Sequence, residues 1–294
     1  MSKEIINTKM QVLTLVAQGN PMGKVTPQSI GQEYVDTTTG RIFKAVGLGN
    51  NQWAFIGQGN ASNDFTPDQM SNLAFWFDAS DKSLLTLDSE NNISSFSSRI
   101  NNVILARNST PSWKYQENLQ NGRGGAFNPF PNDQVMQYIR EGFSFQFTQG
   151  LSAYMVIKPT VLPGYYMRLM GFHDNNRWYP WSYISTAGNF HAEWGTGDVQ
   201  IAPVVLNQPV IFWFRFSGTN RGDQSFLSGV NNQQTFNNTW WYENYNVRGM
   251  AILGNSNGYA FRGQFFEQLT FFNQISEDDH QKILTYLNSK WAIY

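Results

Sequence analysis

The acidic side chains are the first groups in this sequence that could do chemistry. Hydrolysis of a glycosidic bond needs two facing carboxyl groups, about 5 to 5.5 Å apart for retention of configuration or about 6.5 to 9.5 Å apart for inversion. Glu193 and Asp198 are five positions apart around two glycines, a spacing that does not indicate a catalytic pair. The acidic run at 277–279 lies where a helix is expected to begin, so capping explains it. We therefore predict that the protein is not an enzyme.

Two aromatic segments, residues 175–183 and 237–245, could bind a ligand and are expected to form loops. Sugars present C–H faces to flat rings and hydroxyl groups to amides, and both segments place Trp and Tyr beside Asn. The candidate carbohydrate-binding residues are Trp178, Tyr179, Trp181, Tyr183, Trp240, Trp241, Tyr242 and Tyr245. The same rings would equally suit a core or a subunit interface, and the sequence leaves these alternatives open.

The chain offers few metal ligands. It has three histidines and no cysteine, which excludes disulfides, thiolate metal sites and cysteine nucleophiles. His280 falls on the apolar face of a predicted helix, where a packed and hydrogen-bonded ring is expected. The sequence therefore predicts no zinc site and no cofactor.

Composition excludes two kinds of partner. The chain has 20 Lys and Arg against 21 Asp and Glu, a net charge of -1, and no basic run that could release counterions from a phosphate backbone. No window approaches the roughly 18 apolar residues of a membrane-spanning helix. We expect neither nucleic-acid binding nor membrane insertion.

The first 57 residues are expected to form a small β module. The alternating pattern of Met10–Ala17 is strand-like, and turn residues separate the three short strands of the module, expected at Glu33–Val35, Arg41–Val46 and Gln52–Ile56. A sheet of this size is too small to be stable alone, so we expect other chains to complete it. Residues 58–72 should form a linker and a short helix over 67–71, which Thr66 and Pro67 would begin.

Residues 73–294 are expected to form one all-β sandwich. Aromatic-rich strand candidates recur between turn signals, as in a sandwich or jelly roll. They are Leu73–Phe77, Phe143–Phe147, Ser152–Ile157, Tyr166–Phe172, Phe190–Trp194, Val210–Phe216, Gln224–Leu227, Gly249–Leu253 and Phe265–Phe272. One helix is expected from Glu277 to about Lys290, capped by Ser276 and packed on the sandwich.

Several segments of this region resemble those of one known superfamily. They are Leu73–Asp81, Leu151–Pro159, Phe214–Thr219 with the hairpin Leu227–Val230, and Phe261–Trp291. Through these segments, residues 73–294 resemble the laminin-G-like, concanavalin-A-like lectin/glucanase superfamily, which implies a jelly-roll sandwich with a C-terminal helix. In the hairpin, Ser228 stands where family members often carry Asn.

The resemblance also bears on sites. Glucanases of this superfamily carry their acids on one strand as Glu-x-Asp-x-x-Glu or a close variant, which this chain lacks. Laminin-G relatives sometimes bind calcium through loop carboxylates, and the resemblance makes Asp78, Asp81, Asp174 and Asp198 the candidates. For Asp78 and Asp81 a turn-forming role is the stronger expectation.

The segment Gly31–Gly57 is similar to short modules of phage head-fibre and tail-fibre proteins. This resemblance implies a bacteriophage virion-surface protein, made in the host cytoplasm without a signal peptide. Residues 1–57 would bind capsid or tail proteins and support a homo-oligomer, with a trimer favoured. The sandwich would display a lectin-like site for host or environmental glycans. The alternatives are a glycan-degrading enzyme of the same fold and a decoration protein without a ligand.

Overall fold

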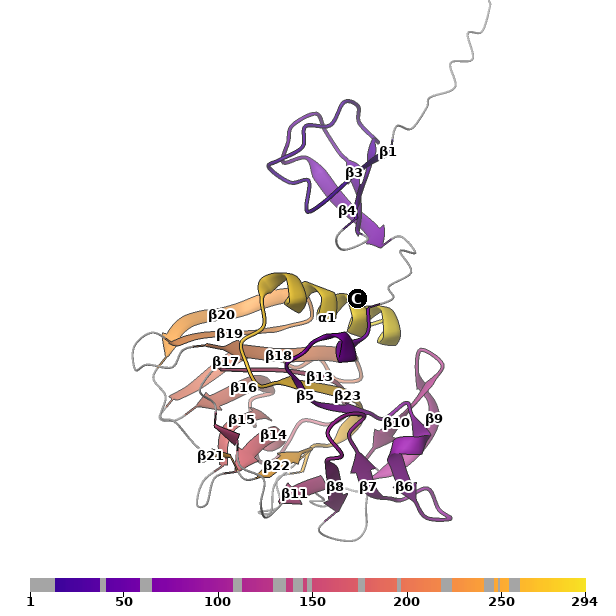
Figure 1. Cartoon of the computed structure of the whole chain (residues 1–294), viewed down its shortest axis with the longest axis vertical. Coiled ribbons are helices and arrows are strands. Elements are labelled where there is room, and N and C mark those ends of the chain that lie inside the picture. Colours follow the sequence, from indigo (N-terminus) through magenta and orange to yellow (C-terminus); the bar gives the residue numbers. More distant parts are fainter. Residues whose placement is uncertain are drawn as a thin grey trace, which may run out of the picture. The chain divides into compact units, whose positions relative to one another are not determined.

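The computed structural model describes residues 14–37, 41–58, 65–107, 113–128, 136–139, 145–146, 150–173, 178–194, 197–217, 224–240, 246–247, 249–253 and 260–294. The chain divides into two compact units, Met1–Thr66 and Pro67–Tyr294. Figure 1 shows a small sheet in the first unit and stacked sheets with one long helix in the second.

The first unit contains one sheet in the order β1-β2-β3-β4. Its strands are β1 (Thr14–Ala17), β2 (Glu33–Asp36), β3 (Arg41–Ala45) and β4 (Trp53–Gln58). The predicted module of three strands has a fourth, because β1, which lies in the strand-like segment Met10–Ala17, pairs with β2 in parallel. The sequence showed this strand but not its place in the sheet, because parallel pairing needs a long connection that leaves no local turn signal.

This unit has its own small core. Tyr34, Phe43, Ala45 and Trp53 form a buried cluster, and the Tyr34 and Trp53 rings meet edge to face at 5.6 Å. The Trp53 indole Nε1 donates to the carbonyl of Val25 at 2.7 Å, which ties the irregular connection to the sheet. That other chains complete this unit stays a prediction.

The second unit is built on two large sheets. One sheet has the order β20-β19-β18-β13-β23-β10-β9, with β5 also paired to β23, and the other has the order β17-β16-β15-β14-β22-β11-β8-β7-β6. The eight strands of the first sheet are β5 (Leu73–Asp78), β9 (Lys114–Gln120), β10 (Arg123–Phe127), β13 (Leu151–Pro159), β18 (Val210–Phe216), β19 (Gln224–Val230), β20 (Gln233–Trp240) and β23 (Gly263–Phe271). The nine strands of the second are β6 (Leu85–Leu87), β7 (Ile93–Ser97), β8 (Ile104–Arg107), β11 (Met136–Ile139), β14 (Met167–His173), β15 (Trp178–Ile184), β16 (Asn189–Trp194), β17 (Gly197–Pro203) and β22 (Gly249–Ile252).

Four short elements complete this unit. They are the strand pair β12 (Phe145–Gln146) and β21 (Asn246–Val247) and the 3₁₀ turns η1 (Pro67–Gln69) and η2 (Lys82–Leu84). Its helix is α1 (Glu277–Trp291).

The core lies between the two large sheets. Phe212 of the eight-stranded sheet stacks on Phe190 of the nine-stranded sheet with ring centroids 5.4 Å apart, and Phe265 meets Phe96 at 5.9 Å. Both pairs belong to one continuous buried cluster. Burial of apolar side chains on this scale supplies the main driving force of folding. The two stacked sheets and the helix confirm the predicted all-β sandwich with a C-terminal helix.

Helix α1 covers the other face of the eight-stranded sheet (Figure 1). Trp213 of β18 meets His280 at 4.3 Å, and Phe266 of β23 meets Trp291 at 5.1 Å. With both faces covered, all six residues of β5 are buried. A strand buried on both faces reads as a continuous apolar run, which explains the Leu-Ala-Phe-Trp-Phe sequence.

The described part of the first aromatic segment is a strand and not a loop. Residues 178–184 form β15, which pairs with both β14 and β16. The register with β14 jumps from Gly171↔Trp181 to His173↔Trp178, so Tyr179 and Pro180 lie at an irregularity. Proline is tolerated in a sheet at such a bulge, and its presence is why the sequence favoured a loop.

The hairpin between β19 and β20 turns later than the resemblance implied. Ser228 and Gly229 lie within β19, and Asn231 follows it with a φ of 56°. Asn tolerates the left-handed conformation better than most residues, so it suits a tight turn at this point.

Candidate functional site

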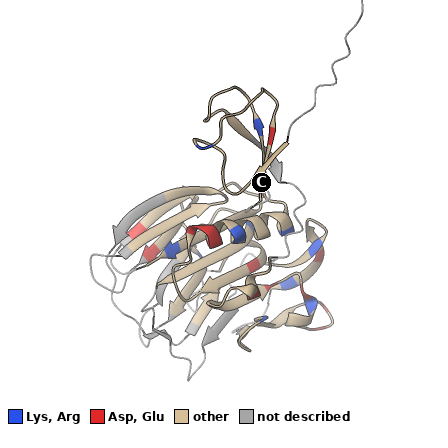
Figure 2. Cartoon of the chain, turned by 45° about the horizontal axis from the view of Figure 1, so that its top comes forward, with Lys and Arg blue, Asp and Glu red and all other residues tan. Residues whose placement is uncertain are grey.

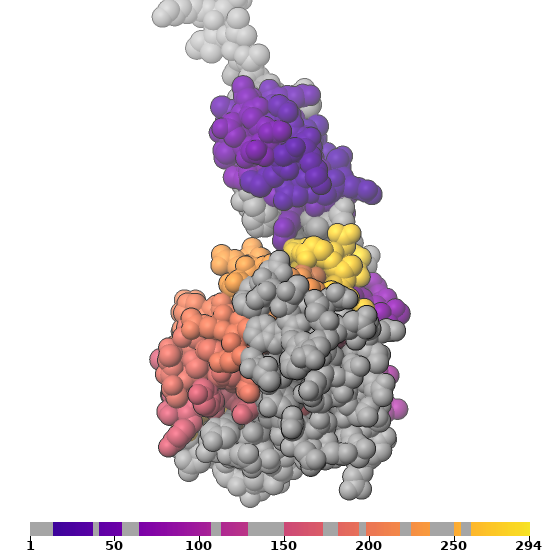
Figure 3. Space-filling model, turned by 90° about the vertical axis from the view of Figure 1, so that its left-hand side faces the viewer, coloured from indigo at the N-terminus to yellow at the C-terminus, as the bar shows by residue number. Residues whose placement is uncertain are grey.

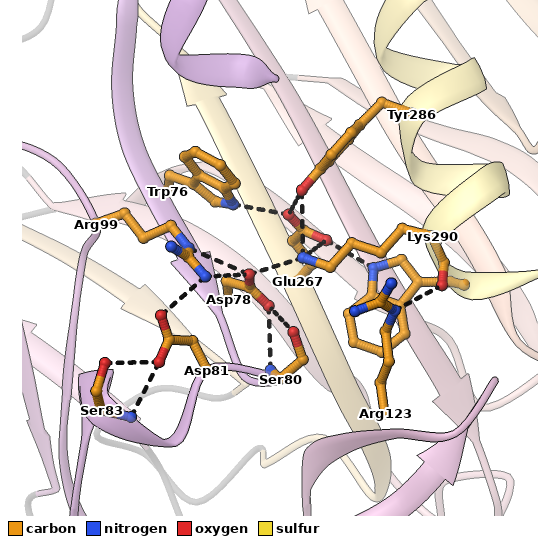
Figure 4. Close-up of polar contacts among 11 residues, drawn as sticks. Trp76, Asp78, Ser80, Asp81, Ser83, Arg99, Arg123, Glu267, Tyr286 and Lys290 are labelled. Atoms are coloured by element: carbon orange, nitrogen blue, oxygen red, sulfur yellow. Dashed lines mark hydrogen bonds and ion pairs between the residues drawn. The ribbon is translucent and has the colours of Figure 1, made fainter. Parts of the chain in front are cut away.

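A buried ionic cluster joins α1 to the sandwich (Figure 4). Asp78 of β5 and Glu267 of β23 are cross-strand partners, and both are buried. Lys290 of α1 lies between them, with Nζ 2.7 Å from Asp78 Oδ2 and 2.9 Å from Glu267 Oε2. Arg99 Nη2 is 2.9 Å from both Asp78 Oδ2 and Asp81 Oδ2.

Neutral donors satisfy the rest of the Glu267 carboxylate. Trp76 Nε1 and the Tyr286 hydroxyl donate to Oε1 at 2.7 and 2.9 Å, and Trp291 Nε1 donates to Oε2 at 2.6 Å. Burial raises the pKa of Glu267, which Lys290 opposes and Asp78 reinforces.

Asp78 differs in its electrostatics from the neighbouring Glu267. Burial alone would raise the pKa of Asp78, but Lys290, the hydrogen bond from Ser80, and Arg99 lower it below its usual range. The Asp78 and Glu267 carboxylates are thus enclosed and matched by donors. Such a buried network fixes the position of the helix on the sandwich.

A second polar group lies on the face of β14–β17 that points away from the core. Along β16, Phe190 and Ala192 are buried in the core, whereas His191 and Glu193 alternate with them and are partly exposed. Side chains of a strand point to opposite faces in turn, so these two share the outer face. The part of the surface that β16 and β17 form is salmon in Figure 3.

Strand pairing brings the two acids of the first sequence motif together. Glu193 and Asp198 are direct partners across β16 and β17. Directly opposite residues of an antiparallel pair have Cβ atoms about 4.5 to 5.5 Å apart. The sequence analysis missed this pair because it judged spacing along one strand. The two-residue interval between Trp194 and Gly197, which are also partners, was the signal that could have revealed it.

His191 and Tyr183 organise the Asp198 side of this face. His191 Nδ1 is 3.0 Å from Asp198 Oδ1 and 3.4 Å from the Tyr183 hydroxyl. Because a carboxylate only accepts, Nδ1 carries a proton and donates it to Asp198. The Tyr183 ring stacks on His191 at 4.9 Å and meets the Tyr166 ring edge to face at 5.0 Å.

Exposure separates the two tyrosines. Tyr183 is 7% exposed and Tyr166 is 51% exposed, so Tyr183 supports the stack while Tyr166 presents its ring to solvent. Burial and the Asp198 carboxylate raise the pKa of Tyr183 well above its usual value, which keeps its hydroxyl protonated. We call Tyr166, Arg168, Tyr183, His191, Glu193 and Asp198 the outer-face site.

Glu193 is the perturbed acid of the outer-face site. Burial raises its pKa, the nearby Arg168 guanidinium opposes this, and the negative charge of Asp198 adds to it. A carboxyl group with a raised pKa beside a second carboxylate is the arrangement that acid catalysis of glycoside cleavage uses.

The predicted site residues fall in different places. Trp178, Tyr179, Trp181 and Tyr183 all lie on β15, and Trp240 ends β20. Trp241, Tyr242 and Tyr245 lie outside the described residues. Of these eight residues, Tyr183 has a described side chain, and it joins the outer-face site. The sequence missed Tyr166, Arg168 and His191 as its neighbours.

The calcium candidates have other partners. Asp78 accepts from Ser80 N at 3.1 Å and Asp81 accepts from Ser83 N at 3.0 Å, which confirms their expected turn-forming role. Asp198 binds His191, and Asp174 lies outside the described residues. Within the described ranges, no three His, Asp or Glu side chains are grouped closely enough to hold a metal ion. The helices in those ranges are all too short or too polar to cross a membrane.

Comparison with known proteins places the fold. No protein-family model matches the chain, and no curated protein matches it significantly. A Trypanosoma rangeli sialidase in complex with the inhibitor DANA matches with a TM-score of 0.51 and 11% identity, over 88% of this chain and 45% of that chain. Another structure of Trypanosoma rangeli sialidase matches with a TM-score of 0.50 and 10% identity, over 89% and 46% of the two chains. Domain 4 of AbnA, a GH43 extracellular arabinanase from Geobacillus stearothermophilus, matches over 73% of this chain and 98% of that chain with a TM-score of 0.47 and 14% identity.

The chain therefore shares a β-sandwich fold with part of these sialidase chains. It spans less than half the length of the sialidase chains, and at this identity the likeness shows the fold alone. The resemblance of residues 31–57 to phage fibre modules gains no support from these matches.

The prediction that the protein is not an enzyme is corrected by these findings. It rested on the absence of a carboxylate pair, and the sheet register places Glu193 opposite Asp198. The sialidase chains that share the fold are themselves enzymes, so the fold gives no ground for that prediction.

Proposed function

We propose that the protein recognises a glycan at the outer-face site. The observation that carries this proposal is the exposed Tyr166 ring braced on Tyr183 beside the Glu193–Asp198 pair. An aromatic ring offers a flat apolar surface to the C–H face of a sugar, and carboxylates accept from its hydroxyl groups. Trp178, Tyr179 and Trp181 are proposed to extend the site along β15.

Calorimetric titration of the full chain with neutral and charged oligosaccharides tests this proposal. Tyr166→Ala should weaken binding about tenfold, or about 1.4 kcal/mol, because the flat apolar contact is lost. Tyr294→Ala is the matched control, since Tyr294 is a similarly exposed ring at the end of the chain. Equal affinities for the wild type and Tyr166→Ala would contradict the proposed site.

A second candidate function is glycan hydrolysis at the same site, favoured by the raised pKa of Glu193 beside Asp198. Glu193 would protonate the leaving glycosidic oxygen, and the Asp198 carboxylate would stabilise or attack the anomeric carbon before water completes the reaction. Release of reducing ends from a polysaccharide, lost in Glu193→Gln, would support it. Release that persists unchanged in that variant would reject this assignment.

We propose further that the first unit attaches the protein to a partner assembly. Its support is a group of large apolar side chains that this small unit leaves exposed: Val16, Met22, Ile30, Val46 and Leu48. Burying such side chains against a partner would remove apolar surface from water and stabilise the complex. The partners proposed are sister chains, in a trimer, and capsid or tail proteins of a phage particle. Sedimentation of the full chain and of residues 67–294 tests assembly, and a monomeric full chain would reject the trimer.

A further inference from the structure

The charges of the outer-face site narrow its ligand class. Resting on the glycan recognition proposed above, we propose that this site binds neutral or amino sugars and discriminates against sugars that carry a carboxylate. The groups that carry this inference are Glu193, Asp198 and Arg168, whose charges and exposure differ in a way that a sugar would sense.

Acceptors dominate what the site presents. Glu193 is partly exposed, and the Asp198 side chain is 47% exposed. Ionised carboxylates accept hydrogen bonds and donate none. Sugar hydroxyl groups and ammonium groups donate, so they match this surface, whereas a sugar carboxylate brings only more acceptors and the same charge.

The cation of the site is turned inward. Carboxylate recognition by arginine uses two guanidinium nitrogens side by side. Nε and Nη1 of Arg168 are both buried. Each fork of the guanidinium includes one of these nitrogens, so Arg168 does not offer an accessible fork to an acidic sugar. Its charge acts instead on Glu193, whose pKa it lowers against the effect of burial.

His191 holds the Asp198 side chain. Its Nδ1 lies 3.0 Å from Asp198 Oδ1, and its ring stacks on Tyr183. The neighbouring Tyr166 ring gives a sugar an apolar surface that is indifferent to charge. The Tyr166 ring would thus contribute affinity for any sugar, whereas the carboxylates would discriminate between neutral and acidic sugars.

The test is a panel of trisaccharides of gluco, galacto and manno configuration, each in a neutral, a 2-amino and a 6-carboxylate form. Binding to the full chain is measured by calorimetry at low and high salt. On a configuration that binds, we expect the carboxylate form to bind at least tenfold more weakly than the neutral form, with the difference shrinking at high salt. Asp198→Asn should reduce this discrimination.

Glu117→Gln is the matched control, because it removes the same charge from an exposed side chain of the other sheet. It should leave the discrimination unchanged. Binding of the carboxylate form as tight as that of the neutral form would overturn the inference while leaving glycan recognition intact. Absence of binding to the whole panel would overturn the proposed function and the inference with it.

Discussion

Two pairs of carboxylates face each other across neighbouring strands, and their surroundings give them different roles. Asp78 and Glu267 are partners across β5 and β23, and Glu193 and Asp198 across β16 and β17. The first pair is enclosed under α1 with Lys290 between the acids. The second lies on a face whose described strands carry no helix over them. Burial and a bridging ammonium make one pair structural, whereas exposure leaves the other able to meet a ligand.

The role of Lys290 can be measured against a second lysine of the same helix. Lys290→Met would leave two buried carboxylates without their ammonium, so we expect a loss of about 3 to 5 kcal/mol in the free energy of unfolding. Lys282 pairs with Asp279, and its side chain is 44% exposed. Lys282→Met should therefore change the free energy of unfolding by less than about 1 kcal/mol. Urea denaturation measures both. Similar small losses would show that the cluster does not stabilise the helix.

His280 makes stability depend on pH. Burial and the nearby Arg215 lower the pKa of His280 to about 3, against 6.5 for an imidazole in water. Between pH 3 and pH 6.5, His280 therefore binds a proton in the unfolded chain but not in the folded chain. The folded state is favoured above pH 6.5, and this advantage is lost as the pH falls toward 3. The Tyr154 hydroxyl lies 2.7 Å from His280 Nδ1 and gives the neutral ring a hydrogen-bond partner.

The measurement is the free energy of unfolding at pH 7 and pH 5 for the wild type and His280→Gln. The wild type should lose about 2 kcal/mol from this group between the two values. The raised pKa values of Glu193 and Glu267 act in the opposite direction, so the comparison with His280→Gln isolates the histidine. Equal pH slopes for the two proteins would contradict the assignment.

At the scale of elements, α1 is held at both ends. Ser276 caps its start by accepting from Asp279 N at 3.1 Å. At its end, Gln120 and Asn121 of the β9–β10 hairpin donate to the carbonyls of Trp291 and Lys290 at 2.8 and 2.9 Å. Charged residues of both signs lie along this helix (Figure 2). The orphan carbonyls of a helix end need such donors, so hairpin and helix stabilise each other.

The last turn of α1 predicts a stabilising substitution. Ala292 has a φ of 50°, in the left-handed region where helices usually place glycine. Ala292→Gly removes the Cβ clash, which costs about 1 kcal/mol, and should raise the midpoint of thermal unfolding. Ala202→Gly, in the extended strand β17, should lower it instead. A lower midpoint for Ala292→Gly would show that the end of the helix does not strain the backbone.

Elements also show how far the sequence could be interpreted. The buried strands β13, β18 and β23 and the helix were predictable, because each is a long apolar run or has a capped 3.6-residue period. The strands β6–β10 are short or polar, and β15 contains Pro180, so their patterns resemble loops. Of the outer-face site, Tyr183 was predicted. Glu193 and Asp198 were noticed and set aside, because their proximity arises from pairing between strands and not from spacing within one.

At the scale of the whole molecule, strand β23 organises the sandwich. One edge pairs with β13, and the other pairs with β10 near its start and with β5 near its end. Segments far apart in the sequence therefore meet on one strand. The ion pairs of Lys290 with Asp78 and Glu267 also attach α1 to this strand. Pairings so distant in sequence close long loops, so the sandwich should fold slowly.

The two units should also unfold separately. The buried residues of the first unit form one cluster, those between the large sheets form another, and no residue belongs to both. A cluster built on Tyr34, Phe43, Ala45 and Trp53 buries far less apolar surface than the sandwich core, so the first unit should be the less stable. Amide exchange should therefore be faster in β2–β4 than in β13 and β23. Removing residues 1–66 should shift the midpoint of the main thermal transition by less than about 4 °C, the effect of about 1 kcal/mol in a domain of this size. A much larger fall would mean that the sandwich depends on the first unit for its stability, and the units would then have to be treated as one cooperative structure.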